Sequence, residues 1–277
     1  MSQDREPEHI SKKTVVYRIP GMDAVTVWRD VEYRTTETCA LTMDVYYPPD
    51  SQSGTRLPAV VFVAGFPDAG FEARVGCKFK EMSASVSWAR LAAASGLIAI
   101  TYTNREPATD IHALLEHVRR NAARLGIDEN RVGLWASSGN VPLALSVLMT
   151  EASEFLQCAV LCYGYMLDLD GDEHVARAAK TWGFANPCAG RSFDELPEGL
   201  PLFVVRAGRD EMAHLNETID RFLTKALTRN LPVAFVNHPT APHAFDLLHD
   251  GETSREIIRQ ILSFMKFHLA AERADSR

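Results

Sequence analysis

The stretch RVGLWASSGN, residues 131–140, decides the fold that the sequence predicts. It has the pattern of a short buried strand that runs directly into a turn of small residues, with Ser138 at the apex. A helix that opens with Val141 and Pro142 follows the turn. A serine on so sharp a turn carries its hydroxyl exposed above the sheet, and the amide of the next residue points to where an oxyanion would form. The pattern therefore indicates a nucleophilic serine.

Strand and helix patterns alternate on both sides of this turn. The predicted strands are Thr14–Ile19, Val31–Arg34, Leu41–Tyr47, Pro58–Ala64, Leu97–Tyr102, the serine strand, Cys158–Tyr163, Pro201–Val205 and Pro232–Val236. The predicted helices are one that ends near Ser95, then Ala108–Leu125, Val141–Met149, Asn216–Thr228 and a last one around Ile257–Leu269. This alternation predicts an α/β fold, a doubly wound and mainly parallel sheet that is covered on both faces. The early strands predict an antiparallel N-terminal edge.

The domain organisation that we expect is simple. Residues 1–13 are polar and charged and predict a flexible N-terminal tail, while residues 14–277 form a single domain. One segment, about residues 166–200, interrupts the alternation and is rich in Asp and Gly. So long a connection within a compact domain is usually functional or mobile. We expect it to form a small lid over the carboxyl edge of the sheet.

Composition excludes several classes of protein. The net charge of −7 and the lack of a Lys/Arg cluster argue against nucleic acid as a partner. No apolar run approaches the roughly 20 residues that cross a bilayer, and residues 1–13 do not resemble a signal peptide. The five cysteines are odd in number and scattered, so neither a disulfide framework nor a zinc site is indicated. We expect a cytoplasmic protein without membrane partners. Its oligomeric state is open, with a homodimer as one option.

Two later strands end at residues that would activate a serine. A serine hydroxyl needs a base within hydrogen-bond reach, and that base needs an acid to orient it. Asp210 follows the strand 201–205, after Gly208, and His243 lies on the loop between the last strand and the last helix. Since the carboxyl ends of parallel strands meet at one edge of a sheet, the order Ser138, Asp210, His243 predicts a catalytic triad.

Other residues compete for these roles. In the other register Ser137 would be the nucleophile, but Trp135 would then occupy the first small position, where its ring would clash. The acid-rich run 168–173 lacks the ligand spacing of a calcium loop, so we expect a solvated lid face, no metal and no cofactor. The remaining nearby histidines are interpreted as structural or surface residues, and two acids as surface carboxylates: His214, His238, His249, Asp220 and Asp246.

From about residue 40 to its end, the chain resembles the α/β-hydrolase superfamily, above all its esterase and dienelactone-hydrolase-like members. The motif G-x-S-x-G is matched as Ala136-Ser137-Ser138-Gly139-Asn140, with Asn140 in place of the last glycine. The loop AGFP, residues 64–67, is similar to the family motif H-G-x-P. The resemblance implies that the backbone N–H groups of Phe66 and Gly139 form the oxyanion hole. No cysteine occupies the turn, which disfavours dienelactone hydrolysis itself.

The resemblance also implies a function. It indicates a carboxylesterase-type serine hydrolase that cleaves small carboxylic esters through an acyl-enzyme on Ser138. We expect the substrate pocket to include Phe66, Tyr165, Trp182 and Phe184. The alternatives are a peptidase or an acyltransferase of the same fold, and a non-catalytic ligand-binding protein, which the irregular Asn140 motivates.

Overall fold

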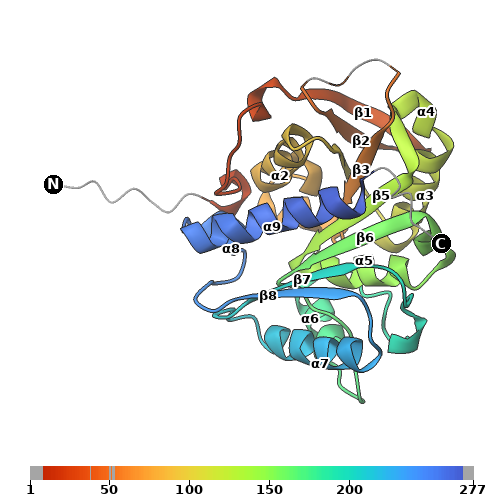
Figure 1. The fold of residues 1–277 in the computed structure, drawn as a ribbon. Coiled ribbons are helices and arrows are strands. Elements are labelled where there is room, and N and C mark those ends of the chain that lie inside the picture. The colour runs from red at the N-terminus through yellow and green to blue at the C-terminus, as the bar shows by residue number, and fades with distance from the viewer. Residues whose placement is uncertain (1–8, 38, 50, 52–53, 271–277) are drawn as a thin grey trace, which may run out of the picture.

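A computed structural model describes residues 9–37, 39–49, 51 and 54–270 of the chain. Within these residues, one sheet runs through the molecule in the order β1-β2-β4-β3-β5-β6-β7-β8 (Figure 1). The strands are β1 (Thr26–Thr35), β2 (Ala40–Tyr47), β3 (Leu57–Phe62), β4 (Ile98–Tyr102), β5 (Ile127–Ser137), β6 (Leu156–Cys162), β7 (Leu202–Ala207) and β8 (Val233–His238). β1 and β2 are antiparallel to their neighbours, and the pairs from β4 to β8 are parallel. The predicted fold class is thus confirmed, including its antiparallel edge.

Helices follow the strands along the chain. They are α1 (Asp68–Val75), α2 (Ser83–Ala94), α3 (Pro107–Arg120), α4 (Ala122–Leu125), α5 (Val141–Leu148), α6 (His174–Trp182), α7 (Leu215–Thr228), α8 (Phe245–Leu248) and α9 (Glu252–His268). Proline occupies the start of α3 and of α5, where its missing N–H costs nothing and its fixed φ suits a helix. No helix of the described ranges is long and apolar enough to cross a membrane.

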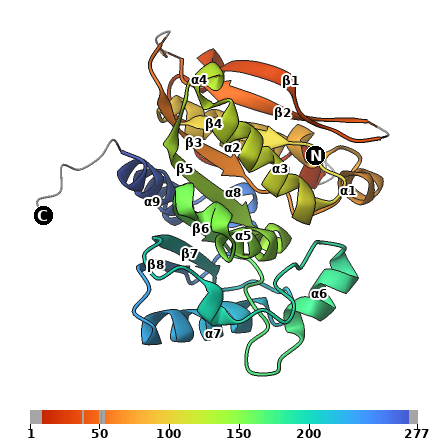
Figure 2. The ribbon, with the colours of Figure 1, turned by 90° about the vertical axis from the view of Figure 1, so that its right-hand side faces the viewer.

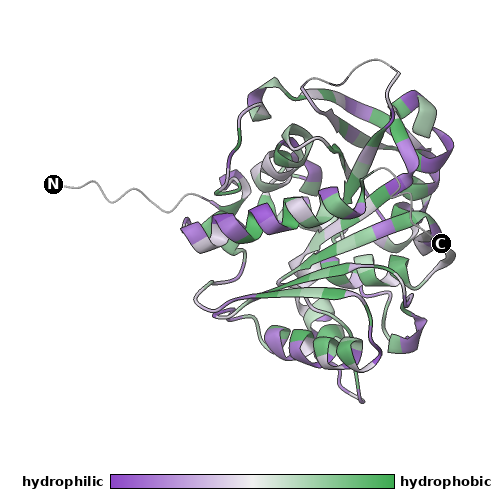
Figure 3. Cartoon of the chain, viewed as in Figure 1, coloured by the Kyte–Doolittle hydropathy of each residue, from purple (hydrophilic) through white to green (hydrophobic). Residues whose placement is uncertain are grey.

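Two hydrophobic cores lie on opposite faces of the sheet. Along β3, Ala59 and Val61 belong to the core that also contains apolar residues of α3, α5 and α7, while Val60 and Phe62 belong to the core with α2 and α9. Figures 1 and 2 show α9 on one face and α3 and α5 on the other. Figure 3 shows the central strands as mainly hydrophobic, which is expected where a strand is covered on both faces.

Two predictions of secondary structure were wrong. Thr14–Ile19 is not a strand: instead, the N–H of Val15 donates to Ser87 Oγ on α2 at 3.0 Å, and that of Val16 to the carbonyl of Asp246 at 2.8 Å. Val15, with Val16 and Tyr17, packs against the core that contains apolar residues of α2 and α9, and an apolar run alone does not distinguish such a segment from a strand. The predicted helix Ala108–Leu125 is two helices, because the backbone leaves helical geometry at Asn121.

The structure describes part of the expected N-terminal tail and all of the segment 166–200. Residues 1–8 of the expected tail lie outside the described residues, and Ile10–Lys12 form a 3-10 turn. The interrupting segment 166–200 lies between β6 and β7 and contains α6 and a 3-10 turn at Phe193–Glu195. It contacts the loop after β3 through a hydrogen bond from the N–H of Ala185 to the carbonyl of Gly65, 2.8 Å long.

Candidate active site

Ser138, His243 and Asp210 meet at the carboxyl edge of the parallel strands. Ser138 follows β5, Asp210 follows β7 and His243 follows β8. Ser138 Oγ lies 2.9 Å from His243 Nε2, and His243 Nδ1 lies 2.6 Å from Asp210 Oδ2. The Asp210 side chain is completely buried and its second oxygen accepts the N–H of Met212 at 3.0 Å. An imidazole held between a hydroxyl and a buried carboxylate is the arrangement that activates a serine.

The turn that carries Ser138 is strained. Ser138 has a φ of 54°, a conformation that only a few per cent of residues other than glycine adopt. β5 ends at Ser137, and a 3-10 turn at Ser138–Asn140 leads directly into α5. The small residues of the motif are needed here, because a Cβ on Gly139 would lie 2.6 Å from the ring of Phe184 and 2.8 Å from that of Phe66. The serine therefore projects from a tight corner between strand and helix.

The loops that carry Asp210 and His243 are bonded to each other. The N–H of Gly208 donates to the carbonyl of His238 at 2.8 Å, and that of Arg209 to the carbonyl of Ala241 at 2.8 Å. A Cβ on Gly208 would lie 2.6 Å from the carbonyl oxygen of Pro239. Glycine is thus needed at position 208, where the two loop backbones come close together. The bonded loops fix the Asp210 carboxylate and the His243 imidazole relative to each other.

The loop after β3 packs against the serine turn. The N–H of Gly65 donates to Asn140 Oδ1 at 2.7 Å, and Asn140 is buried. A Cβ on Gly65 would lie 2.9 Å from the Cα of Asn140, so the two backbones nearly touch. Phe66 is the next residue, and Gly139 lies in the first turn after β5, where backbone N–H groups have no acceptor within the helix. The extra bulk of Asn140 is accommodated, since its side chain ties the two loops together.

A buried carboxylate lies beneath this loop. Asp68, the first residue of α1, accepts the N–H of Asn104 at 3.0 Å and that of Phe79 at 3.5 Å. Burial raises the pKa of its carboxyl to about 6, although both N–H groups and Lys78 lower it in part. The Asn104 side chain donates in turn to the carbonyl of Ala64 at 3.0 Å. Asp68 and Asn104 together therefore support the loop that carries Phe66.

Two cavities open beside Ser138. The first, of about 290 Å³, extends between α2 and the His243 loop and is mainly aromatic, with walls that include Phe62, Phe66, Phe71, Phe79, Trp88, Trp135 and Tyr163. The second, of about 250 Å³, lies toward the segment 166–200 and is lined by Phe66, Phe71, Arg74, Gly139, Tyr165, Trp182, Phe184 and Met212. Ser138 and His243 line both cavities, so an ester bound at Ser138 has room for a group on either side.

The structure brings the four predicted pocket residues together. Phe66 lines both cavities, and Tyr165, Trp182 and Phe184 line the second. Phe184 is buried, stacks on Tyr165 with 5.7 Å between ring centroids, and meets Phe66 edge to face at 5.9 Å. Trp182 is largely exposed, and its carbonyl accepts a hydrogen bond from Arg74 on α1. The segment 166–200 is thus anchored to the loop and helix that come after β3.

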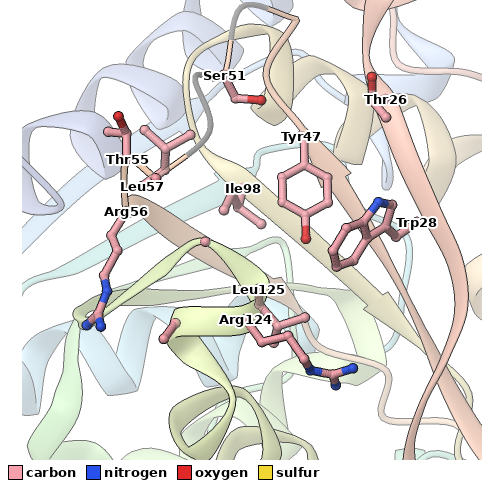
Figure 4. Close-up of a pocket in the computed structure, with 13 residues that line it drawn as sticks. Thr26, Trp28, Tyr47, Ser51, Thr55, Arg56, Leu57, Ile98, Arg124 and Leu125 are labelled. Atoms are coloured by element: carbon pink, nitrogen blue, oxygen red, sulfur yellow. The ribbon is translucent and has the colours of Figure 1, made fainter.

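A larger cavity lies away from these residues. It has a volume of about 640 Å³ and lies beside the starts of β3 and β4, the opposite edge of the parallel strands from Ser138. Figure 4 shows Trp28 and Tyr47 side by side in this cavity, with Arg56 across from them and Arg124 below the two rings. The ring centroids of Trp28 and Tyr47 are 5.3 Å apart. None of the three triad candidates lines this cavity, so size alone does not identify the site.

The sequence interpretation of Asp246 as a surface carboxylate was wrong. Asp246 is buried, and its two oxygens accept hydrogen bonds from Trp88 Nε1 at 2.6 Å and from the Tyr163 hydroxyl at 2.5 Å. Burial raises the pKa of this carboxyl, although both hydrogen bonds lower it in part. The Tyr163 ring also meets the ring of His243 edge to face, 5.2 Å away. In the sequence, the only signal that Asp246 lies near the serine site was its position shortly after His243.

The remaining competitors lie outside the serine site. His238 is buried and lies 3.1 Å from Ser254 Oγ, and His249 lies 3.0 Å from the same oxygen. His214 is exposed beside Glu217, and Asp220 is exposed beside Arg206. Their interpretation as structural or surface residues agrees with these positions. Ser137 also lines the aromatic cavity, but the hydrogen bond to His243 comes from Ser138.

Comparison with known proteins bears on the fold. No protein-family model matches the sequence, and no curated protein is significantly similar to it in sequence. Among solved structures, esterase 2 of Thermogutta terrifontis, phosphoramylated by tabun, has a TM-score of 0.65 at 17% identity, covering 91% of this chain and 98% of that one. The hyperthermophilic esterase of the archaeon Pyrobaculum calidifontis has a TM-score of 0.65 at 20% identity, with 89% and 86% covered. A bacterial heroin esterase has a TM-score of 0.67 at 15% identity, with 90% and 86% covered. The similarity thus extends over nearly the whole of each chain, and the protein has the α/β-hydrolase fold.

Proposed function

We propose that the protein is a serine hydrolase that cleaves small carboxylic esters through an acyl-enzyme on Ser138. One observation carries the proposal: Ser138, His243 and Asp210 form a continuous hydrogen-bonded chain of 2.9 and 2.6 Å beside two cavities. The similar esterases support it as well, since one is described as phosphorylated by paraoxon and another as propionate-bound. No cofactor is needed for this chemistry.

The proposed mechanism assigns one role to each residue. Ser138 attacks the ester carbonyl while His243 Nε2 accepts its proton, and Asp210 stabilises the imidazolium through Nδ1–H. The N–H groups of Phe66 and Gly139 bind the oxyanion. His243 then protonates the leaving alcohol, and a water that it activates releases the acid from Ser138. Losing one oxyanion donor typically costs about 10²–10³ in rate, so the position of the loop that carries Phe66 contributes to catalysis alongside the triad.

Cavity size and lining support the substrate class. Cavities of about 290 and 250 Å³ accommodate small acyl and alcohol groups, and the aromatic walls of the first favour apolar ones. The segment 166–200 would act as the lid, closing the second cavity through Tyr165, Trp182 and Phe184. The binding-protein alternative rested on Asn140, and the bond of Asn140 to Gly65 weakens that argument.

The first experiment combines labelling with turnover. Wild type, Ser138→Ala and Ser137→Ala are incubated with a fluorophosphonate for intact-mass analysis and assayed with p-nitrophenyl acetate and butyrate. We expect wild type and Ser137→Ala to gain one adduct, and Ser138→Ala to gain none and to lose turnover by about 10⁴-fold or more. An adduct on Ser138→Ala would refute the assigned nucleophile. An unlabelled, inactive wild type would refute the hydrolase and favour the binding protein.

Domain organisation, location and assembly complete the proposal. We propose one domain over residues 14–277 with a cytoplasmic location, supported by the buried free thiols of Cys158, Cys162 and Cys188. Its substrate is a small-molecule ester, and a homodimer is the assembly to test first. Light scattering coupled to size exclusion would measure the mass against the 30.7 kDa of one chain.

A further inference from the structure

One dipeptide of the segment between β6 and β7 contacts both parts of the proposed oxyanion hole. The N–H of Ala185 donates to the carbonyl of Gly65, in the loop after β3, at 2.8 Å. The ring of the preceding residue, Phe184, lies so close to the serine turn that a Cβ on Gly139 would be 2.6 Å from it. The same ring meets that of Phe66 edge to face, with 5.9 Å between centroids. The dipeptide thus packs at once on the loop after β3 and on the turn after β5.

The bond from Ala185 acts on the peptide group that contains the Phe66 amide. The carbonyl of Gly65 and the N–H of Phe66 belong to one planar peptide group, and in a trans peptide they point in opposite directions. No peptide bond of the described residues is cis. A donor that holds the carbonyl on one side therefore fixes the direction of the N–H on the other. The bond also polarises the peptide group, because hydrogen bonds in a chain strengthen one another, and so makes the Phe66 N–H a stronger donor.

The loop after β3 is held from two sides and leaves one donor unused. The N–H of Gly65 donates to Asn140 Oδ1 on the serine turn, and its carbonyl accepts from Ala185. Among the described residues, the N–H of Phe66 has no hydrogen-bond acceptor, as expected of a donor that is kept for a substrate. Ala185 lines neither of the two cavities beside Ser138. Its bond therefore lies behind the loop, away from the space that an ester would occupy.

We propose that Phe184 and Ala185 position the oxyanion hole, and that the Ala185 N–H is the group that aims the Phe66 amide. The inference rests on the serine hydrolysis proposed above and adds to it a positioning residue that contacts no substrate. The Arg74 side chain on α1 donates to the carbonyl of Trp182, three residues before Ala185, and so fixes the same segment to the body of the protein. The segment between β6 and β7 would then contribute to the rate as well as covering the second cavity.

The ratio of ester to thionoester hydrolysis tests this role. The substrates are p-nitrophenyl acetate and its thiono analogue, in which sulfur replaces the carbonyl oxygen. Sulfur is a weak hydrogen-bond acceptor, so a thionoester gains less than an ester from the oxyanion donors. A smaller fraction of folded enzyme lowers both rates equally and leaves their ratio unchanged. The ratio of the two kcat/KM values therefore separates a misplaced donor from a general loss of structure.

Two variants weaken the contact in different ways. Ala185→Pro removes the N–H that bonds to Gly65. Its kcat for the ester should fall by about 10²-fold with little change in KM, and the ratio should fall by a similar factor. Arg74→Met loosens the same segment and leaves the Ala185 N–H in place, so the ratio should fall by a smaller factor. This second variant keeps the test decisive if Ala185→Pro does not fold.

Ala189→Pro is the matched control. It makes the same replacement at an exposed residue of the same segment, whose N–H bonds to the carbonyl of Asn186 at 3.3 Å and not to the loop after β3. Its ratio should equal that of wild type. Unchanged ratios in Ala185→Pro and Arg74→Met, or an equal fall in Ala189→Pro, would overturn the positioning role.

Fluorophosphonate labelling of wild type, measured by intact mass, tests the serine hydrolysis separately. A labelled and active wild type, with variants whose ratios do not change, would overturn this inference alone. An unlabelled and inactive wild type would overturn the proposed function and this inference together.

Discussion

At the scale of single residues, Asn140 has the most informative position. In the resembling family a glycine stands there, and the sequence alone left its effect open. The structure places its amide oxygen 2.7 Å from the N–H of Gly65, one residue before Phe66. A glycine could not make this bond. In this chain a side chain therefore supplies the connection between the serine turn and the loop after β3.

We predict that Asn140→Ala impairs catalysis more than binding. The buried N–H of Gly65 would lose its acceptor, at a cost of about 1–3 kcal/mol in the free energy of unfolding. A looser loop would misplace the Phe66 amide, and kcat should fall by about 10- to 100-fold with little change in KM. Steady-state kinetics and urea unfolding would measure both effects.

Asn121→Ala is the matched control for this variant. Asn121 donates to the carbonyl of His117 at 2.9 Å, and it lies between α3 and α4, away from both cavities. Its replacement should lower stability and leave kcat unchanged. If Asn140→Ala and Asn121→Ala had equal kcat, Asn140 would have a purely structural role.

At the scale of elements, the site depends on the loops at the carboxyl ends of four strands. The loop after β7 is bonded to the loop after β8 through the N–H groups of Gly208 and Arg209. The loop after β3 is bonded to the serine turn after β5 through the side chain of Asn140. The loop after β3 is supported from below by Asp68 and Asn104. Because Asp68 has a pKa raised to about 6, this support contains a group that titrates close to neutral pH.

We predict that Asp68 makes stability depend on pH. Its pKa is 3.8 in the unfolded chain and about 6 in the folded protein, so between these values the folded state holds a proton that the unfolded state has released. The free energy of unfolding therefore falls as pH rises from about 4 to 6, by up to about 3 kcal/mol from this group. Asp68→Asn lacks this titration.

The difference in stability between Asp68→Asn and wild type isolates this contribution. Whatever its value at pH 4, it should shift in favour of the variant by up to about 3 kcal/mol on going to pH 7. Urea unfolding at several pH values would measure it. A difference that stays constant with pH would show that the Asp68 pKa is not raised in the folded protein.

At the scale of the whole molecule, Asp246 joins distant parts of the chain. Its carboxylate binds Trp88 on α2 and Tyr163 after β6, and its carbonyl accepts the N–H of Val16. Through these two groups, the buried residue Asp246 connects the N-terminal segment, the helix α2 and the edge of the serine site. The same contacts explain why Val16 lies against α8 instead of forming a strand.

We predict that Asp246→Ala is strongly destabilising. The Trp88 indole N–H and the Tyr163 hydroxyl would both be left buried without an acceptor, which should cost about 2–5 kcal/mol in the free energy of unfolding. Asp220→Ala is the matched control, since that carboxylate is 55% exposed in its pair with Arg206 and should contribute less than about 1 kcal/mol. Equal losses in urea unfolding would contradict the structural role of Asp246.

Much of the fold was predictable because periodic patterns encode it. The apolar runs of β3 to β7 predicted those strands within a few residues, and the parallel sheet could be inferred from their alternation with helices. The order of Ser138, Asp210 and His243 along the chain was also readable, since each comes after its own strand. The structure brings these side chains together, and their catalytic roles stay a prediction.

The amino-acid sequence alone was enough to predict the strands of the parallel sheet and the edge at which Ser138, Asp210 and His243 gather. Burial of apolar strands and the direction of the chain dictate these features. The partners of Asn140, Asp246 and His174 emerged only once the chain was folded. The partners of Asn140 and Asp246, and His214 beside His174, lie between 40 and 230 residues away, and no local pattern records such a contact. In the sequence, a polar residue that becomes buried looks the same as one that stays solvated. Only packing excludes water from it and supplies another polar group as its partner.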